Sequence, residues 1–246
     1  MEWIYLSPHF DDVALSCGGL VWEQVQAGQP VNIWTICAGA PPAGPISAFA
    51  QLLHSRWETG EQAVARRLAE DIASCEALGA GWRHFDLPDC IYRPGGESGV
   101  YYYDSEEALW GEVHPAEFPL IEKLAGIMDR DLASTAQVIC PLALGRHVDH
   151  RLTRMVAEGL GRRLWYYLDY PYVLKETATL DALQLEGGQN ITFAISEGGL
   201  AAWQDGIATH QSQISTFWPG LDAMRAAIRA YRDEMGGIRL VELSLK

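Results

Sequence analysis

The residues best suited to chemistry in this chain are a histidine and two adjacent carboxylates near its start. His9 precedes Asp11 and Asp12, and all three follow the apolar run 2–7. Consecutive residues of a turning chain point in different directions, so one carboxylate can bind a metal ion while the other faces an open coordination position. The structural alternative is that the aspartates cap a following helix, as Asp commonly does.

A second polar turn carries the same residue types. His147 and His150 bracket Asp149, and this turn follows another apolar run, 137–142. Two imidazoles and a carboxylate with open positions suit Zn²⁺ or Fe²⁺. Either turn alone is more often a hydrogen-bonding or capping structure, but both together favour a shared metal site. The expected ligands are His9, Asp12 and His150.

These groups together predict a hydrolase. A metal ion lowers the pKa of a bound water towards about 7, and Asp11 could take the proton of that water as general base. His147, oriented and kept protonated by Asp149, is the candidate for stabilising the oxyanion of a tetrahedral intermediate. Removing such a donor typically costs on the order of 10²–10³ in rate.

Short apolar strands and amphipathic helices alternate along the chain and must position these turns. The pattern predicts strands at 2–7, 31–37, 84–87, 137–142, 164–168, 191–195 and 239–243. It predicts helices at 20–27, 57–79, 119–132, 151–160, 199–212 and 221–231. Such alternation is typical of a three-layer α/β fold with a mostly parallel sheet, whose sites form at the carboxyl ends of strands. With no internal repeat and no long linker, we expect one domain, 1–246.

The composition excludes several classes of partner. Acidic residues outnumber basic ones 32 to 18, which gives a formal net charge of −14. This balance argues against a general nucleic-acid binder and against adhesion to anionic membranes. No stretch approaches the roughly 20 apolar residues of a membrane helix, so we expect no membrane insertion.

The ends and the cysteines add an expected location. The N-terminus has no basic and apolar leader, so we expect no signal peptide. Five scattered cysteines predict buried, reduced thiols in a cytoplasmic protein. The oligomeric state stays open, with a homo-oligomer among the alternatives.

Beyond these single features, the motifs resemble a known family in order along most of the chain. Ser7–Asp12 with Leu15–Gly19, and Gly145–His150, are similar to the two His/Asp motifs of the LmbE-like, or PIG-L, zinc-dependent N-acetylglucosamine deacetylases. Supporting segments are Arg67–Asp71, Leu78–Gly79, Tyr167–Tyr172 and Ser212–Gln213. The family usually has Pro and Glu where this chain has Phe10 and Val13. Because neither position is a ligand, the difference concerns substrate shape and not the chemistry.

The resemblance implies a Rossmann-like fold and removal of an N-acetyl group from an amino sugar or its conjugate. The zinc ligands of the family match His9, Asp12 and His150. Asp11 matches the general base. His147 matches the residue that stabilises or protonates the intermediate, with Asp149 as its partner, and Arg67 matches a substrate contact.

Two other functions stay open. One is a metal-containing carbohydrate- or metabolite-binding protein that has lost catalysis. The other is a nucleotide-dependent transferase, which is disfavoured because Cys17-Gly18-Gly19 lacks the full glycine fingerprint and predicts only a tight strand-to-helix turn with close helix packing. The loop containing Tyr101–Tyr103 is a candidate lid, and His54 is expected at the surface.

Overall fold

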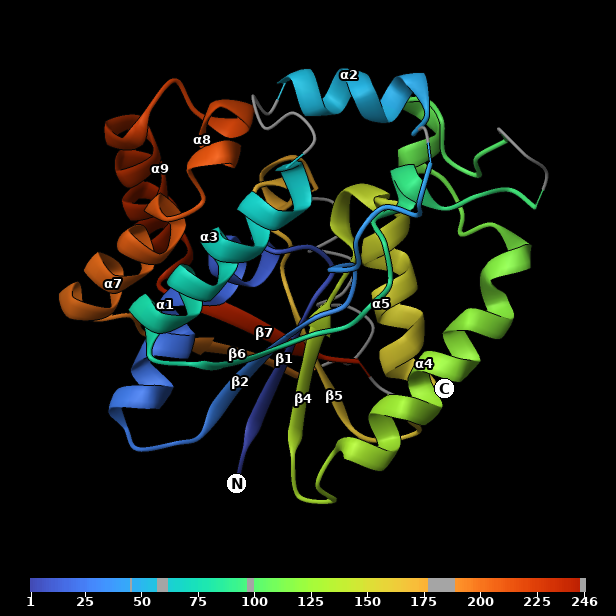
Figure 1. Ribbon diagram of the computed structural model, residues 1–246. Helices are drawn as coiled ribbons and strands as arrows, with labels where there is room; N and C mark the ends of the chain where they lie inside the picture. The colour runs from blue at the N-terminus through green and yellow to red at the C-terminus, as the bar shows by residue number, and fades with distance from the viewer. Residues whose placement is uncertain (45, 57–61, 97–99, 177–188, 244–246) are drawn as a thin grey trace.

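The computed structural model shows an α/β fold built on one seven-stranded sheet (Figure 1). It describes residues 1–44, 46–56, 62–96, 100–176 and 189–243. The strands are β1 (Trp3–Ser7), β2 (Val31–Thr35), β3 (Gly81–His84), β4 (Gln137–Pro141), β5 (Leu164–Tyr167), β6 (Gln189–Phe193) and β7 (Ile238–Glu242). Their order across the sheet is β3-β2-β1-β4-β5-β7-β6.

Strands β1 to β5 pair in parallel, and near one edge β7 pairs antiparallel with both of its neighbours, β5 and β6. The central strands are almost wholly buried, because helices cover both faces of the sheet. This burial explains why these strands are continuous apolar runs in the sequence. The predicted α/β class with a mostly parallel sheet is therefore confirmed.

Two helical layers sandwich the sheet, as Figure 1 shows. One layer holds α1 (Asp12–Gln26), α3 (Ala63–Leu78), α7 (Glu197–Ala208), α8 (Gln211–Phe217) and α9 (Leu221–Met235). The other holds α4 (Phe118–Asp131) and α5 (Val148–Glu158), which pack on each other. The short α2 (Ala48–Arg56) lies beyond the carboxyl ends of the strands. In the part of the chain that is described, no helix is both long and apolar enough to cross a bilayer.

The strand order reverses between β1 and β4. The chain passes from β1 outward through β2 to β3, then returns to β4 and continues to β5 on the other side. At such a switch point the loops that leave neighbouring strands diverge and open a crevice. The two polar turns leave the sheet at this point.

Several predicted boundaries were wrong. The third strand, expected at 84–87, lies at Gly81–His84. The helix expected over 199–212 is broken into α7 and α8 by Thr209 and His210. Of the helix expected at 57–79, residues 57–61 lie outside the described part and α3 begins at Ala63, but its expected end is correct, with Leu78 last and Gly79 as the C-cap at φ 75°.

The first helix starts eight residues earlier than predicted, at Asp12 instead of Leu20. Gly18 and Gly19 therefore lie inside α1 and not in a turn. A Cβ on Gly18 would lie 2.7 Å from a ring carbon of Trp203 on α7. The glycines thus permit α1 and α7 to approach closely. The predicted close helix packing is therefore confirmed, and the predicted turn at these glycines is wrong.

The five cysteines are all buried and free, as expected. His54 is also buried, contrary to the expectation of a surface residue, and its ring pairs with the Tyr92 hydroxyl at 2.5 Å. Helix α2, which carries His54, was not predicted, because the segment is only nine residues long and its apolar residues do not recur over several helical turns.

Candidate active site

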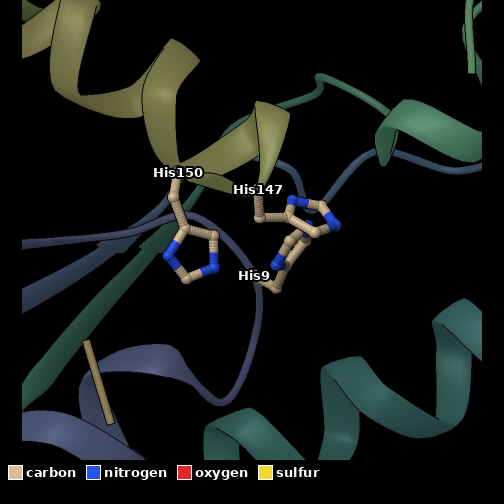
Figure 2. A group of neighbouring side chains, drawn as sticks. All are labelled: His9, His147 and His150. Atoms are coloured by element: carbon tan, nitrogen blue, oxygen red, sulfur yellow. The ribbon is translucent and has the colours of Figure 1, made fainter. Parts of the chain in front are cut away.

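The two polar turns, 138 residues apart, meet at the carboxyl end of the sheet. His9 follows β1, and His147 lies at the N-cap of α5, so that His150 falls in the first turn of that helix. The ring centroids lie 5.0 Å apart for His9 and His147, and 5.6 Å apart for His9 and His150. Figure 2 shows the three rings gathered around one point. The sequence had placed His150 in a turn; it lies in a helix because His147 caps that helix.

Asp12 lies between two of these rings. Its Oδ2 atom is 3.2 Å from His9 Nδ1, and its Oδ1 atom is 3.3 Å from His150 Nε2. Ligands of a tetrahedral zinc ion at about 2.0–2.1 Å lie about 3.3 Å from one another. Each of these two contacts matches that spacing, one through each carboxylate oxygen, so Asp12 can share a cation with the imidazole of His9 or of His150.

The field at this point also favours a cation. Burial alone would lower the pKa of His150, but Asp12 and Asp169 raise it to about 10. Burial likewise opposes the charge on Asp12, yet His150 and His9 hold the pKa of its carboxyl well below the usual range. The carboxylates of Asp12 and Asp169 thus stabilise positive charge beside His150, and they would stabilise a bound cation in the same way.

The outward nitrogen of each of the two imidazoles contacts a second carboxylate. His9 Nε2 is 2.9 Å from Asp149 Oδ2, and His150 Nδ1 is 2.7 Å from Asp169 Oδ1. Metal-binding histidines commonly donate their other N–H to a carboxylate, which fixes the ring and its tautomer. His9 and His150 thus have the surroundings expected of ligands.

Other ligand sets are possible by distance alone. Among the described residues, one donor atom each of His9, His147 and His150 lies within 4.8 Å of the others. Two further groupings both require Asp149. The carboxylate of Asp149 is already engaged, with Oδ1 beside Arg93 and Oδ2 accepting from the Cys90 backbone N–H, so it is a poor candidate ligand.

Asp149 and His147 pair differently from the expectation. The backbone N–H of Asp149 donates to His147 Nδ1 at 3.2 Å, while the Asp149 carboxylate contacts His9 and Arg93. Burial, and then the charge of His9, lowers the pKa of His147 well below its usual value. His147 is therefore held as a neutral ring with its proton on Nε2, and not as a cation maintained by Asp149.

Asp11 and Arg67 lie beside His9, Asp12 and His150, which form the candidate metal-ligand cluster. Arg67 Nη2 is 3.3 Å from Asp11 Oδ1, and Nη1 is 3.9 Å from Asp89 Oδ2. The guanidinium lies over the Phe10 ring, 5.6 Å from its centroid. Asp11, Arg67 and Asp89 line one cavity of about 560 Å³, a size typical of small-molecule sites.

Apolar and aromatic side chains form the outer wall of this cavity. They are Leu53, Ile91, Leu109, Trp110, Tyr172 and Phe217. Trp110 is 40% exposed, and its ring meets those of His147 and Tyr172 edge to face at 5.2 and 5.6 Å. A partly exposed indole thus lines the cavity next to His147 and Tyr172.

This arrangement agrees with the match of residues 4–159 to the PIG-L family, described as GlcNAc-PI de-N-acetylase. The chain belongs to the PIG-L family. It is 30% identical over 190 residues to a 2′-N-acetylparomamine deacetylase of Niallia circulans, covering 69% of this chain and 66% of that protein. A protein of the same name from Streptomyces fradiae is 30% identical over 184 residues, with 69% and 57% covered. The chain thus spans less than two thirds of the length of either relative.

Solved structures show the same PIG-L fold. The zinc-inhibited form of the teicoplanin deacetylase Orf2 has a TM-score of 0.79 at 22% identity, over 98% of this chain and 97% of that one. The A40926 pseudoaglycone deacetylase Dbv21 has a TM-score of 0.72 at 24% identity, with 98% and 95% covered. These matches show that the fold extends over nearly the whole chain.

Some residues of this PIG-L site were not singled out from the sequence. Asp89 follows the predicted strand 84–87, and Asp169 follows the strand 164–168. A carboxylate directly after a strand is the same signal that identified Asp11 and Asp12, so both could have been found. Arg93 lies in irregular chain, and Glu117 ends the short 3₁₀ helix Pro115–Glu117 before α4, so no spacing pointed to either.

The lid interpretation of Tyr101–Tyr103 finds no support. None of the three tyrosines lines the cavity as far as the described residues define it. Tyr103 is buried, and its hydroxyl donates to Glu117 at 2.6 Å. Residues 97–99 of this loop lie outside the described part.

Proposed function

We propose that this protein is a metal-dependent hydrolase that removes the N-acetyl group from an N-acetylglucosamine-type amino sugar or its conjugate. The observation that carries the proposal is Asp12 set between His9 and His150, with Asp11 beside it in the same cavity. The family description and the names of both curated relatives, which are deacetylases of acetylated amino sugars, support the reaction class.

We propose Zn²⁺ as the cofactor, held by His9, Asp12 and His150, and the same donors also suit Fe²⁺. A divalent ion there would supply Lewis acidity to the reacting oxygen atoms. The remaining chemistry belongs to side chains of the chain itself.

Asp11 is the proposed general base. It lies in the cavity next to the metal-ligand cluster and accepts a proton from the attacking water as the new C–O bond forms. The same carboxyl then returns this proton to the nitrogen as the C–N bond breaks. The products are acetate and the free amino sugar.

His147 is the proposed oxyanion donor. Because its Nδ1 atom accepts the Asp149 backbone N–H, the ring carries its proton on Nε2 and can donate it as a hydrogen bond. A neutral donor serves this role as the carbonyl oxygen gains charge. Asp149 thus acts on His147 through its backbone.

The lining of the cavity supports an amino-sugar conjugate as the substrate class. Arg67 and Asp89 offer charged partners for sugar hydroxyls near Asp11. The aromatic outer wall leaves room for a group attached to the sugar, which favours a conjugate over a free monosaccharide. We further propose a cytoplasmic location, which the five buried, free thiols support.

The test is acetate release by the zinc-reconstituted protein from a panel of N-acetylglucosamine conjugates. A chelated sample and Asp11→Asn serve as controls. We expect release that the chelator abolishes and that Asp11→Asn nearly eliminates. A protein that binds zinc and the sugars but releases no acetate would instead be the non-catalytic binding protein.

A further inference from the structure

A buried arginine lies behind the metal-ligand cluster and outside the motifs described above. Arg93 is 4% exposed and pairs with two enclosed carboxylates. Its Nη2 atom is 2.6 Å from Asp149 Oδ1, and its Nε atom is 2.6 Å from Glu117 Oε1. Arg93 does not line the described cavity, so it has no route to the substrate.

The two oxygens of the Asp149 carboxylate have different partners. Arg93 contacts Oδ1, while the Cys90 N–H donates to Oδ2 at 3.0 Å. These contacts turn Oδ2 towards His9 Nε2, 2.9 Å away. With a metal ion bound, His9 would donate from Nε2 to Asp149 and keep the lone pair of Nδ1 on the side of Asp12.

The far end of Arg93 is anchored as firmly. Glu117 accepts the Tyr103 hydroxyl at 2.6 Å, and that hydroxyl accepts the His114 backbone N–H at 2.8 Å. The Arg93 guanidinium also lies over the Tyr103 ring, 5.4 Å from its centroid, and donates to the Pro88 carbonyl at 3.3 Å. The guanidinium is thus enclosed between Glu117 and Asp149 by a ring, a backbone carbonyl and two carboxylates.

The planar guanidinium suits this position better than an ammonium would. Its charge is spread over three nitrogens, so it can face two carboxylates at once, here as ion pairs rather than as hydrogen bonds. A buried cation between two buried carboxylates is costly to remove, because the anions lose their partner. One of these two anions, Asp149, contacts the proposed metal ligand His9, so the buried ion pair can control the orientation of that ligand.

We propose that Arg93 is a positioning residue, which fixes Asp149 so that His9 keeps Nδ1 turned towards the metal ion. The inference rests on the proposed function for the identity of the ligands. It assigns Arg93 an effect on metal affinity and turnover through His9, with no contact to substrate.

The test compares Arg93→Met and Arg93→Lys with Arg154→Met. Arg154 lies on α5 and also joins an ion pair and a backbone carbonyl bond, with Glu158 and Leu142, but away from His9. The readouts are the zinc Kd from chelator competition, the absorption spectrum of the Co²⁺-substituted protein, thermal unfolding without metal, and kcat and KM. Measuring Kd and the spectrum on folded protein separates positioning from a general loss of structure.

We expect Arg93→Met to weaken zinc binding by about 10- to 100-fold, the usual cost of losing a group that orients a metal ligand. Its Co²⁺ spectrum should change and its kcat should fall at zinc saturation, with KM nearly constant. Arg93→Lys should lie between wild type and Arg93→Met, and Arg154→Met should match wild type. A folded Arg93→Met with wild-type zinc Kd and Co²⁺ spectrum would overturn the proposal.

If Arg93→Met is not recovered folded, Arg93→Lys decides. A several-fold loss of zinc affinity supports the proposal, and an unchanged affinity and spectrum overturn it. Acetate release by the wild type tests the proposed function separately, because the metal affinity of the Arg93 variants does not depend on which amide is cleaved.

Discussion

Arg67 reaches Asp11 across the floor of the cavity, with its Nη2 atom 3.3 Å from Asp11 Oδ1. Both side chains are buried, so water screens this pair little. The two come from α3 and from the turn after β1, and the fold brings them together at the switch point of the sheet. The carboxylate proposed as base is thereby held in one orientation by a cation.

Replacing Arg67 with Met should lower kcat/KM by about 10- to 100-fold, since a hydrogen bond to a charged group is worth about 1.5–3 kcal/mol. Arg66→Met is the matched control, because Arg66 points outward to Glu70 from the same helix. Steady-state kinetics on one conjugate would measure both variants. Equal losses in the two would show that the effect comes from the helix and not from the site.

Asp11 and Asp12 should separate in function although they are neighbours. Asp11→Asn should lower turnover by about 10²–10⁴, the usual contribution of a general base, and keep the zinc stoichiometry. Asp12→Asn should lose zinc, because its carboxylate lies between the two imidazoles. Elemental analysis and acetate release check both, and wild-type turnover in Asp11→Asn would refute the base assignment.

The fold and the meeting of the two turns could be predicted from the sequence, for physical reasons. Strands buried on both faces must be apolar throughout, which made β1, β4 and β5 visible. Sites in parallel sheets gather at the carboxyl ends, so polar turns after β1 and β4 were expected to meet. Both inferences depend only on local pattern.

The partners of the site residues could not be predicted in the same way. Asp149 pairs with Arg93, which lies 56 residues earlier in irregular chain, and no periodicity links the two. His147 is a helix cap as well as a site residue, so the start of α5 was placed too late. These contacts are determined by tertiary packing, which the local sequence pattern does not reveal.

His147→Gln should distinguish the ligand set His9, Asp12 and His150 from the set of three histidines, His9, His147 and His150. If His9, Asp12 and His150 hold the metal, the variant keeps zinc and loses about 10²–10³ in kcat, as expected for an oxyanion donor. His150→Gln should instead lower zinc occupancy. Loss of zinc from His147→Gln would favour the three-histidine set.

Trp110 should determine affinity for the group attached to the sugar. Its indole is exposed at the mouth of the cavity, where it can pack on an apolar face. Trp110→Ala should raise KM by about 10-fold for conjugates with apolar aglycones, equivalent to about 1.4 kcal/mol, and leave kcat nearly unchanged. Trp82→Ala, at a similarly exposed tryptophan on β3, is the control. A fall in kcat alone would mean that Trp110 acts through His147.

His210 should make the protein less stable in mild acid. The side chain is buried, and burial lowers the pKa of its imidazole despite the nearby Asp11 and Asp71. The unfolded chain therefore binds a proton more readily than the folded one. The stability that this residue contributes is complete above its ordinary pKa of about 6.5 and is lost as the pH falls through the lower folded value.

Replacing His210 with Gln removes this titration. The difference in unfolding midpoint between about pH 7 and about pH 5 should be smaller in His210→Gln than in wild type, even if the variant is less stable at both. Thermal unfolding at fixed zinc concentration measures it. His114→Gln serves as the control, because the His114 side chain caps a short helix at the surface. Parallel pH profiles for wild type and His210→Gln would show that the buried imidazole does not oppose folding in acid.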